Sequence, residues 1–366
     1  MPAHHLDKTA IPTFANTIVS WQKQHGRHDL PWQGQQQPYQ IWLAEIMLQQ
    51  TQVQTVRAYY VRFLERFPTL EHLAQAPLEE VMPYWAGLGY YARARNLHRC
   101  AQIIVAEHQG CFPPTQAELQ KLPGIGPSTA AAIAAFAFAE RVSILDGNVK
   151  RVLARFAGVR QPVQQRATER LLWDLAQSLV QAAPLDLDMA AYTQGLMDLG
   201  ALVCTRGQPT CSQCPLQNQC YAYQHQLTTD LPTALPKRAY PTRKKHMLIW
   251  LKNKNVLLQQ RPPKGIWGGL LALPESTQQK KLLDFAPAKD YLSHQDLKPL
   301  PKINHRFTHF ALQIQPWLAI SKQPEAQLPK QTPSPYHWTA FNALAETALP
   351  APIKKLLHNI CLQQHE

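Results

Sequence analysis

The chain has 366 residues, 45% of them hydrophobic, and its 37 Lys and Arg residues outnumber its 24 Asp and Glu residues, giving a formal net charge of +13. This length allows two domains with cores of their own, and the odd number of cysteines, seven, argues against a secreted disulfide framework. The positive charge fits equally a basic, soluble surface and a polyanionic partner, of which nucleic acid is the commonest. We expect a cytoplasmic protein with no membrane partner, because MPAHHLDKTAIPTF lacks a signal-peptide pattern and the longest apolar run, Ala130 to Ala139, is too short to span a bilayer.

Helical periodicity dominates the first 224 residues. Apolar residues recur there at the spacing of one helix face, and turn signals rich in proline and glycine interrupt the pattern. The pattern predicts an all-helical domain over residues 1–224. Its expected helices include Ile41–Phe67, Leu78–Trp85, Ala92–His108, Gln116–Leu122, Ser128–Ala139, Val149–Phe156 and Ala167–Ala182.

The composition changes after residue 224. Residues 225–245 hold several prolines and a basic cluster, which predicts an extended linker. Beyond it the period becomes strand-like: HMLIWL and VLLQQ flank KNKN as in a hairpin, and FTHFALQIQPWLAI alternates apolar and polar residues. With a final helix in APIKKLLHNICLQQ, residues 246–366 are predicted to form an α+β domain.

Four of the seven cysteines lie together in CTRGQPTCSQCPLQNQC, with the spacing C-x6-C-x2-C-x5-C. Thiolates at this density indicate a metal site, and general spacing rules leave both zinc and a [4Fe–4S] cluster open. The spacing, directly after a helical domain, resembles the iron–sulfur loop of the endonuclease III superfamily of DNA glycosylases. That resemblance implies a structural, DNA-facing [4Fe–4S] cluster within residues 204–220. Its ligands would be Cys204, Cys211, Cys214 and Cys220.

The segment LPGIGPSTAAAI, residues 122–133, places two glycines at a tight turn before a helix. Gly124 and Gly126 allow backbone N–H groups to approach a phosphate at the helix N-terminus. Together with ILDGNVKRVLARF, the segment resembles the helix–hairpin–helix–Gly/Pro–Asp signature of the same superfamily. The resemblance implies that Asp146, 20 residues beyond Gly126, is the catalytic aspartate. As an ordinary alternative Asp146 would cap the next helix, but we expect Asn148 to fill that role.

A single carboxylate, Glu45, lies in the apolar and amide-rich stretch IWLAEIMLQQTQ, residues 41–52. An ionised Glu in apolar surroundings is costly unless it is paired or its proton is used. The stretch closely resembles the adenine DNA glycosylase (MutY) branch of the superfamily, where a glutamate has this position. The resemblance implies that Glu45 protonates N7 of adenine, for which apolar surroundings would raise its pKa. Asp146 would stabilise the oxocarbenium-like state, and Asn148 would support the pair.

One position separates the catalytic branches of the superfamily. Bifunctional members carry a lysine two residues after the second hairpin glycine, and its amine attacks the sugar. This chain has Ser128 there, which favours a monofunctional glycosylase that uses water. Lys150, near Asn148, is expected to contact DNA and could form incidental adducts with the abasic product.

The family match also implies contacts with DNA, since the adenine must be flipped out of the duplex. In GLGYYARARN, Tyr90 would wedge into the base stack beside basic residues. Gln49, Gln50 and Thr51 would fill the gap and touch the opposite strand. The positions lining the adenine pocket are Trp32, Gln194 and His28, and His28 departs from the Arg or Lys of relatives.

The second domain resembles the Nudix-like domain of the same branch, through RPPKGIWGGLLALPE at residues 261–275. The sequence after Glu275 lacks the acidic R-E-x-x-E-E helix that holds Mg²⁺, so nucleotide hydrolysis is not expected. The lesion-reading loop of the family, usually Phe-Ser-His, corresponds to Phe307, Thr308 and His309.

The sequence therefore predicts a helix–hairpin–helix glycosylase domain with an iron–sulfur loop, followed by a Nudix-like domain that recognises 8-oxoguanine. The implied function is monofunctional removal of adenine opposite 8-oxoguanine or guanine in double-stranded DNA, by a monomer associated with a bacterial nucleoid. Two alternatives remain, a bifunctional pyrimidine-lesion lyase and a non-catalytic, metal-containing DNA-binding protein.

Overall fold

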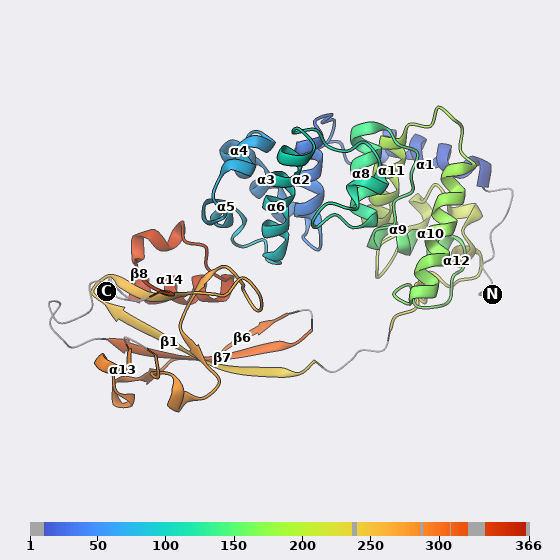
Figure 1. Ribbon diagram of the computed structural model, residues 1–366. Helices are drawn as coiled ribbons and strands as arrows, with labels where there is room; N and C mark the ends of the chain where they lie inside the picture. Colours follow the sequence, from blue (N-terminus) through green and yellow to red (C-terminus); the bar gives the residue numbers. More distant parts are fainter. Residues whose placement is uncertain (1–10, 236–239, 286–287, 308, 321–333, 364–366) are drawn as a thin grey trace. The chain divides into compact units, whose positions relative to one another are not determined.

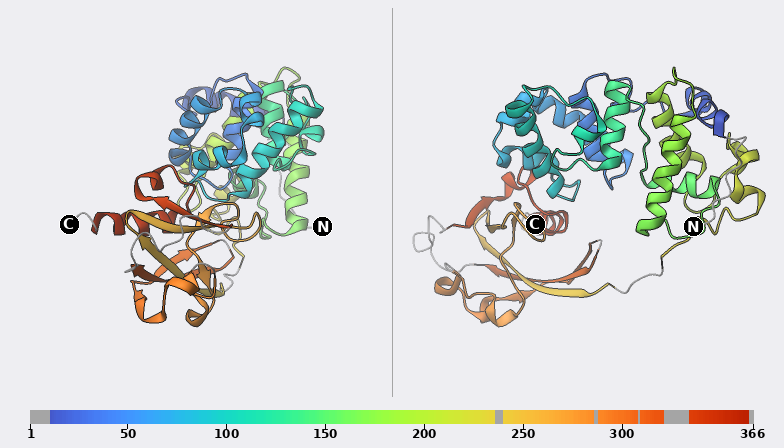
Figure 2. Two further views of the ribbon diagram at one scale, coloured as in Figure 1. Left: turned by 60° about the vertical axis from the view of Figure 1, so that its left-hand side comes forward. Right: turned by 45° about the vertical axis from the view of Figure 1, so that its right-hand side comes forward.

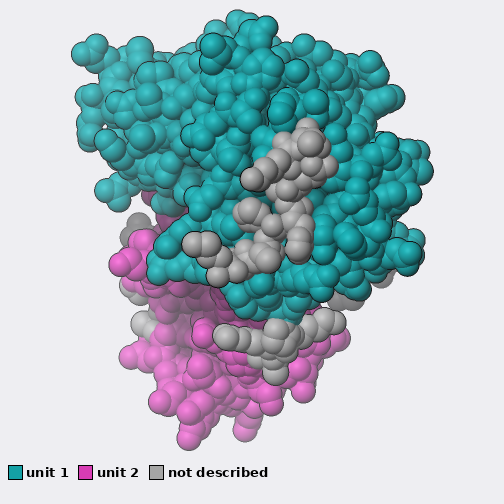
Figure 3. Space-filling model, turned by 90° about the vertical axis from the view of Figure 1, so that its right-hand side faces the viewer, with its two compact units in different colours: residues 1–75, 96–237 teal, residues 76–95, 238–366 magenta. Residues whose placement is uncertain are grey.

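The computed structural model describes residues 11–235, 240–285, 288–307, 309–320 and 334–363. The chain divides into two compact units, shown in teal and magenta in Figure 3. Unit 1 comprises residues 1–75 and 96–237, and unit 2 comprises residues 76–95 and 238–366. None of the described helices is long and apolar enough to cross a membrane.

Helices make up the ordered structure before residue 225 (Figure 1), as the periodicity predicts. Most of the predicted segments match a helix to within a few residues. The helices are α1 (Ile11–His25), α2 (Pro38–Leu48), α3 (Val53–Arg66), α4 (Leu70–Gln75), α5 (Leu78–Trp85), α6 (Ala92–Glu107), α7 (Gln116–Leu119), α8 (Pro127–Phe138), α9 (Gly147–Phe156), α10 (Arg166–Gln181), α11 (Met189–Asp198) and α12 (Tyr221–Gln224).

One predicted helix, Ile41–Phe67, is wrong as a single element. The structure breaks it into α2 and α3, which are separated by a turn at residues 49–52. Gln50 in this turn has a φ of 56°, in the left-handed region that a continuing right-handed helix excludes. Glutamine and threonine are not strong turn formers, so the apolar period alone does not reveal the break.

The core of unit 1 forms where α1 packs against α9, α10 and α11. Phe14 is fully buried, and its ring lies 4.8 Å from that of Phe156 and 6.5 Å from that of Tyr192, centroid to centroid. This packing fixes α9 and α11 against each other through α1. Both of these helices carry residues that the sequence assigns to the functional site.

Unit 2 is built on an eight-stranded sheet. Its central pair, β1 and β7, runs parallel from Thr242↔Ala311 to Leu251↔Ile320, and the other pairings are antiparallel. The predicted hairpin joins β1 to β2 at Leu251↔Val256. The strands are β1 (Thr242–Lys252), β2 (Asn255–Gln260), β3 (Leu271–Ala272), β4 (Glu275–Ser276), β5 (Lys298–Pro299), β6 (Ile303–Arg306), β7 (Ala311–Ile320) and β8 (Tyr336–Ala340).

Both faces of this sheet are covered. Leu248 and Trp250 of β1 pack into a cluster with residues 282–297, the segment that contains α13 (Ala288–Tyr291). Figures 1 and 2 show α14 (Ala351–Gln363) on the opposite face of the sheet. Successive residues of a strand point to opposite faces, so the central part of β1 is buried throughout. The mixed sheet with covering helices confirms the predicted α+β class.

The segment between the helices and the sheet is in part tied to unit 1. Arg155 Nε donates a hydrogen bond to the carbonyl of Leu231 at 2.7 Å, and Thr233 Oγ1 donates to the carbonyl of Arg160 at 2.5 Å. At the other end of this segment, β1 begins at Thr242, within the predicted linker of residues 225–245. The limits predicted for the two domains and the linker stay a prediction.

The aromatic packing around Phe14 leads to a stability prediction. Phe14→Ala leaves a cavity between α1, α9 and α11 and should lower the free energy of unfolding by about 3–5 kcal/mol. Phe14→Leu retains most of the volume and should cost about 1–2 kcal/mol. Urea unfolding followed by the helical circular dichroism signal measures both. A loss below about 1 kcal/mol for the alanine variant would contradict the packing.

Candidate functional site

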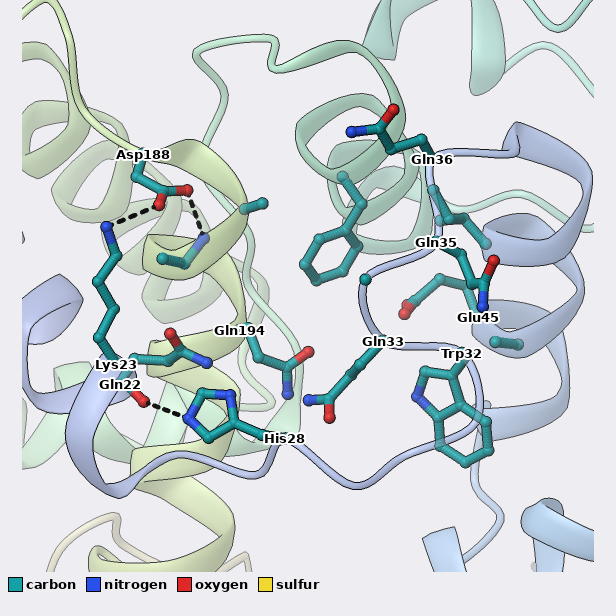
Figure 4. A pocket seen from close by; sticks show the side chains of 16 residues that line it. Gln22, Lys23, His28, Trp32, Gln33, Gln35, Gln36, Glu45, Asp188 and Gln194 are labelled. Atoms are coloured by element: carbon teal, nitrogen blue, oxygen red, sulfur yellow. Dashed lines mark hydrogen bonds and ion pairs between the residues drawn. The ribbon is translucent and has the colours of Figure 1, made fainter.

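Two adjoining cavities in unit 1 contain most of the residues that the sequence assigns to chemistry. The glutamine-lined cavity, of about 360 Å³, is shown in Figure 4. The carboxylate cavity, of about 220 Å³, is lined by both candidate catalytic carboxylates, Glu45 and Asp146. Trp32, Glu45 and Gln194 line both cavities, so Glu45 lies at their junction.

Glu45 comes from the middle of α2, a helix that is otherwise almost entirely apolar. Pro38 occupies the first turn of this helix, where a missing N–H has no cost, and Ile41, Trp42 and Ile46 are buried. Glu45 is the one acidic residue of this helix and lines both cavities, and Figure 4 shows its carboxyl group directed into the space. Burial, and secondly the charge of Asp146, raises the pKa of Glu45 to about 8.

Asp146 is the N-cap of α9. Its Oδ1 accepts a hydrogen bond from the backbone N–H of Val149 at 2.8 Å, and its Oδ2 accepts one from Asn148 Nδ2 at 3.2 Å. The expectation that Asn148 would be the cap is therefore wrong, because the helix begins at Gly147, earlier than the apolar pattern suggests. Burial raises the pKa of Asp146 from its ordinary value, although these hydrogen bonds oppose the shift.

The two carboxyl groups have different environments around one space. Glu45 has apolar helix neighbours, whereas Asp146 accepts hydrogen bonds at the positive end of a helix. Near neutral pH the arrangement favours a proton on Glu45 and a negative charge on Asp146. In such a pair the carboxylic acid can protonate a leaving group, and the carboxylate can stabilise a cationic carbon.

Arg151 connects the carboxylate cavity to the cysteine loop. Its Nη2 donates to Asn148 Oδ1 at 2.9 Å and to the carbonyl of Gly200 at 2.6 Å, and its Nε donates to the carbonyl of Cys204 at 2.7 Å. A side chain at Gly200 would place its Cβ 2.6 Å from Asn148 Cβ, so only glycine allows this approach. The sequence patterns did not identify Arg151, since its role depends on contacts between distant segments.

The four clustered cysteines line one small cavity, together with Arg155. In the described part of the chain no three His, Cys, Asp or Glu side chains converge closely enough to form a metal site as they stand, and none of the seven cysteines is in a disulfide. The lining nevertheless fits a thiolate-bound cluster. Arg155 is 2% exposed, donates to Cys204 Sγ at 3.3 Å, and its buried Nη2 has no hydrogen-bond partner. A buried cation that contacts one of the four thiols and keeps a spare donor suits an anionic iron–sulfur group.

The remaining cysteines are separate from this loop. Cys100 is buried, Cys111 is exposed and Cys361 is intermediate in exposure. Burial raises the pKa of Cys100 to about 12, so it remains a neutral thiol.

The predicted hairpin lies between α7 and α8. Gly124 has a φ of +81°, and an added Cβ would lie 2.9 Å from Asn96 Cβ, so the turn requires glycine. Gly126 is the N-cap of α8, and Ser128 in the first turn lines the carboxylate cavity. Gln49 Nε2 donates to Thr129 Oγ1 at 3.1 Å and to the carbonyl of Gly124 at 3.3 Å, which ties the turn after α2 to the hairpin.

The other candidate DNA contacts lie in several places. Gln50 is exposed in the turn after α2, and Thr51 Oγ1 donates to the carbonyl of Gln49 at 3.4 Å. Lys150 forms an ion pair with Glu169 at 2.5 Å. Tyr90 belongs to unit 2, is 48% exposed and has a φ of 48°.

The ring of Tyr90 packs on the guanidinium of Arg93. The guanidinium of Arg93 lies 5.5 Å from the ring centroid of Tyr90 and 5.3 Å from that of Trp85. The arginine itself is almost completely buried. The cation–π contact with a buried arginine and the positive φ restrict the orientations of this exposed ring.

The side chains assigned to the adenine pocket lie together in the glutamine-lined cavity. Trp32 is nearly buried and packs edge-on against Tyr60, with ring centroids 5.5 Å apart. His28 Nε2 lies 3.1 Å from the carbonyl oxygen of Gln22, and Gln194 Nε2 donates to Asp198 Oδ1 at 2.8 Å. Figure 4 shows His28, Trp32 and Gln194 around the same space as Glu45.

The candidate lesion loop lies in unit 2, between β6 and β7. The Phe307 ring stacks on Phe310 at 4.6 Å and packs against Trp267 and His305 at 5.8 and 4.6 Å. His309 is exposed, and Thr308 lies outside the described residues. The loop therefore presents an aromatic cluster whose rings are packed on one another.

In the described part of unit 2, no carboxylate-rich helix follows Glu275. Residues 279–281 form a short 3₁₀ turn that carries Lys280 and Lys281. Glu275 itself is paired with Lys245 and Arg261, each at 2.9 Å. The Glu275 carboxylate therefore forms ion pairs with two cations of unit 2.

Comparisons with known proteins agree with this architecture. Residues 43–178 match the HhH-GPD superfamily of base excision DNA repair proteins, and residues 246–359 match the NUDIX domain. The adenine DNA glycosylase of Buchnera aphidicola subsp. Baizongia pistaciae is 36% identical, over 95% of this chain and 96% of that protein. The human adenine DNA glycosylase is 34% identical, over 97% of this chain and 75% of that protein. A solved structure of a thermostable thymine-DNA glycosylase is 27% identical with a TM-score of 0.53, over 59% of this chain and 98% of that one.

The raised pKa of Glu45 makes folding stability depend on pH. Its pKa is about 8 in the folded protein against an ordinary value of 4.5, so the folded state holds an extra proton between these values. Stability should therefore fall as the pH rises through this window. Glu45→Gln cannot ionise, and we expect it to be about 1–3 kcal/mol more stable than the wild type at pH 9 but similar at pH 5.

Urea unfolding at both pH values measures this difference. Glu65→Gln, which changes an exposed carboxylate of α3, serves as the control and should show no such pH-dependent gain. The same difference between Glu45→Gln and wild type at both pH values would contradict the raised pKa.

Proposed function

The chain belongs to the adenine DNA glycosylase family, within the HhH-GPD superfamily of base excision DNA repair proteins, and on this premise we propose that it hydrolyses the N-glycosidic bond of adenine opposite 8-oxoguanine or guanine in duplex DNA. It does so as a monofunctional enzyme that flips the adenine out of the helix. It acts as a monomer on nucleoid DNA. Residues 1–224 form the glycosylase domain, 225–245 the linker and 246–366 the domain for 8-oxoguanine.

The observation that carries this proposal is the pair of carboxyl groups in the carboxylate cavity. Neutral Glu45 donates its proton to N7 of the flipped adenine, which converts a poor anionic leaving group into a neutral one. As the bond breaks, the Asp146 carboxylate stabilises the positive charge that develops at the sugar C1′. Asn148 holds Asp146 through its amide, and Glu45, now ionised, accepts a proton from the attacking water.

Water rather than an amine is the nucleophile. Ser128 lines the carboxylate cavity at the hairpin position from which a lysine would reach the sugar. Among the described residues that line the two cavities the one amine is Lys23, which is paired with Asp188 at 3.1 Å. Lys150 is paired with Glu169. The arrangement supports base removal without cleavage of the strand.

The DNA is positioned by backbone and amide groups rather than by base readout. The N–H groups after Gly124 and Gly126, at the start of α8, bind a phosphate, assisted by the helix dipole. Gln49, Gln50 and Thr51 fill the space left by the flipped base. Tyr90, held rigid by Arg93, supplies the ring that wedges into the stack.

Recognition of the opposite base falls to unit 2. The Phe307 loop offers stacked rings and the exposed His309, groups suited to a flat base and its phosphate. Phe307, Thr308 and His309 are the residues that read 8-oxoguanine in this proposal.

The cysteine loop would hold a [4Fe–4S] cluster through Cys204, Cys211, Cys214 and Cys220. When bound, such a cluster supplies a structural cross-link and no step of the hydrolysis. Arg155 would donate to its sulfurs, and Arg151 links the loop to Asn148 beside the catalytic aspartate.

A labelled duplex with one adenine opposite 8-oxoguanine tests the reaction. We expect the wild type to release adenine, so that the strand breaks only after treatment with alkali. Loss of the acid in Glu45→Gln should lower the single-turnover rate by about 10²–10⁴-fold while binding to the duplex is retained. The wild-type rate should fall as the pH rises above about 8, where Glu45 loses its proton.

Glu65→Gln serves again as the matched control and should keep the wild-type rate. A break without alkali would overturn the monofunctional mechanism. Tight binding without release of adenine by the wild type would favour a non-catalytic DNA-binding protein instead.

The cluster assignment predicts the metal content. Protein purified without oxygen should contain about four iron and four sulfide per chain, with visible absorption. Cys214→Ser should lose most of this iron and some helical stability, whereas Cys111→Ser, which changes an exposed thiol elsewhere, should retain both. One zinc per chain and no iron would contradict the assignment.

A further inference from the structure

Asp198, the last residue of α11, is a fully buried carboxylate, and both of its oxygens accept hydrogen bonds. Its Oδ2 accepts the backbone N–H of Arg27 at 2.8 Å. Its Oδ1 accepts Arg27 Nε at 2.7 Å, Arg27 Nη2 at 2.6 Å and Gln194 Nε2 at 2.8 Å. The arginine compensates the buried charge, so the carboxylate is stable without solvent. No sequence motif points to Asp198.

This carboxylate decides which way the Gln194 amide faces. A carboxylate only accepts hydrogen bonds, so the group of Gln194 directed at Asp198 must be its NH₂. The amide oxygen of Gln194 is then left as an acceptor on the side of the cavity, as Figure 4 shows. Asp198 also holds the backbone of Arg27, directly before His28, and so fixes the adjoining wall.

Glu45 and Gln194 line the same two cavities and present opposite hydrogen-bonding groups. Glu45 carries a proton and is a donor, whereas Gln194 presents an acceptor. Adenine has the matching pattern on one edge, the N7 acceptor beside the 6-amino donor, whereas guanine and hypoxanthine present acceptors at both positions. A 6-oxo purine would set its O6 against the amide oxygen of Gln194.

We propose that Asp198 is a positioning residue that locks the Gln194 amide with its oxygen toward the bound base, so that the cavity selects purines with a 6-amino group and rejects 6-oxo purines. This inference rests on the proposed adenine glycosylase function and adds the device that sets its base specificity. Asp198 acts through Gln194 and Arg27 and does not touch the base.

Single-turnover release of adenine and of hypoxanthine, each opposite 8-oxoguanine, tests the proposal. Asp198→Asn replaces an acceptor oxygen with an NH₂ group, which frees the Gln194 amide to rotate. Gln194→Met removes the acceptor and leaves the contacts between Asp198 and Arg27 in place. Both variants should lower the adenine rate by about 10–100-fold and alter the hypoxanthine rate by less than about threefold, so the preference for adenine over hypoxanthine should narrow at least about threefold. Asp174→Asn, an exposed position on α10, is the matched control and should keep the wild-type ratio.

The ratio of the two rates separates positioning from general structural support. If Asp198→Asn lowers both rates by the same factor, its role is structural and the proposal is overturned. If that variant does not fold by circular dichroism, Gln194→Met decides, and an unchanged ratio overturns the proposal. A wild type that releases no adenine from any duplex would instead overturn the proposed function, and this inference with it.

Discussion

Two carboxyl groups that share one cavity cannot both carry a charge without a large cost, and the site of unit 1 depends on this constraint. The asymmetry between them comes from secondary structure. Glu45 is in the middle of an apolar helix, where burial and the charge of Asp146 disfavour its anion, whereas Asp146 caps a helix and accepts the Val149 N–H and the Asn148 amide. The proton therefore stays on Glu45, and the acid and the anion are assigned by backbone geometry rather than by residue type.

Helix α9 connects Asp146, one of the two carboxyl groups, to the rest of unit 1. Asp146 precedes its first turn, and Arg151 and Arg155, four residues apart on one face, both contact the cysteine loop. The same helix packs on Phe14 of α1 through Phe156. A group that fixes the four sulfurs would therefore also limit the motion of Asp146, through the hydrogen bonds of Arg151 and Asn148.

Sequence periodicity and turn residues predicted both the helical class of the first part and the sheet of the second, because amphipathic patterns follow from burial. The patterns failed where backbone conformation, or contacts between segments far apart in the chain, determine the structure. The α2–α3 break occurs at Gln50, a residue type with no turn signal, and the helix after Asp146 begins two positions before its apolar pattern. The roles of Asp198 and Arg155 come from partners far away in the chain, so no local pattern reveals them.

Unit 2 has the sheet of a NUDIX-like domain, but its side chains suit a ligand other than a metal-bound diphosphate. In this chain the segment after Glu275 is a lysine-bearing 3₁₀ turn, and Glu275 is held by two cations, so its carboxylate is not available to a divalent ion. The groups that the sheet presents instead are rings and cations: Arg243 lies 4.4 Å from the Phe310 ring centroid and Arg306 lies 5.1 Å from that of Tyr240. Such a surface suits a flat base beside an anionic backbone better than a metal-bound diphosphate, because stacking and cation contacts need no acidic side chains.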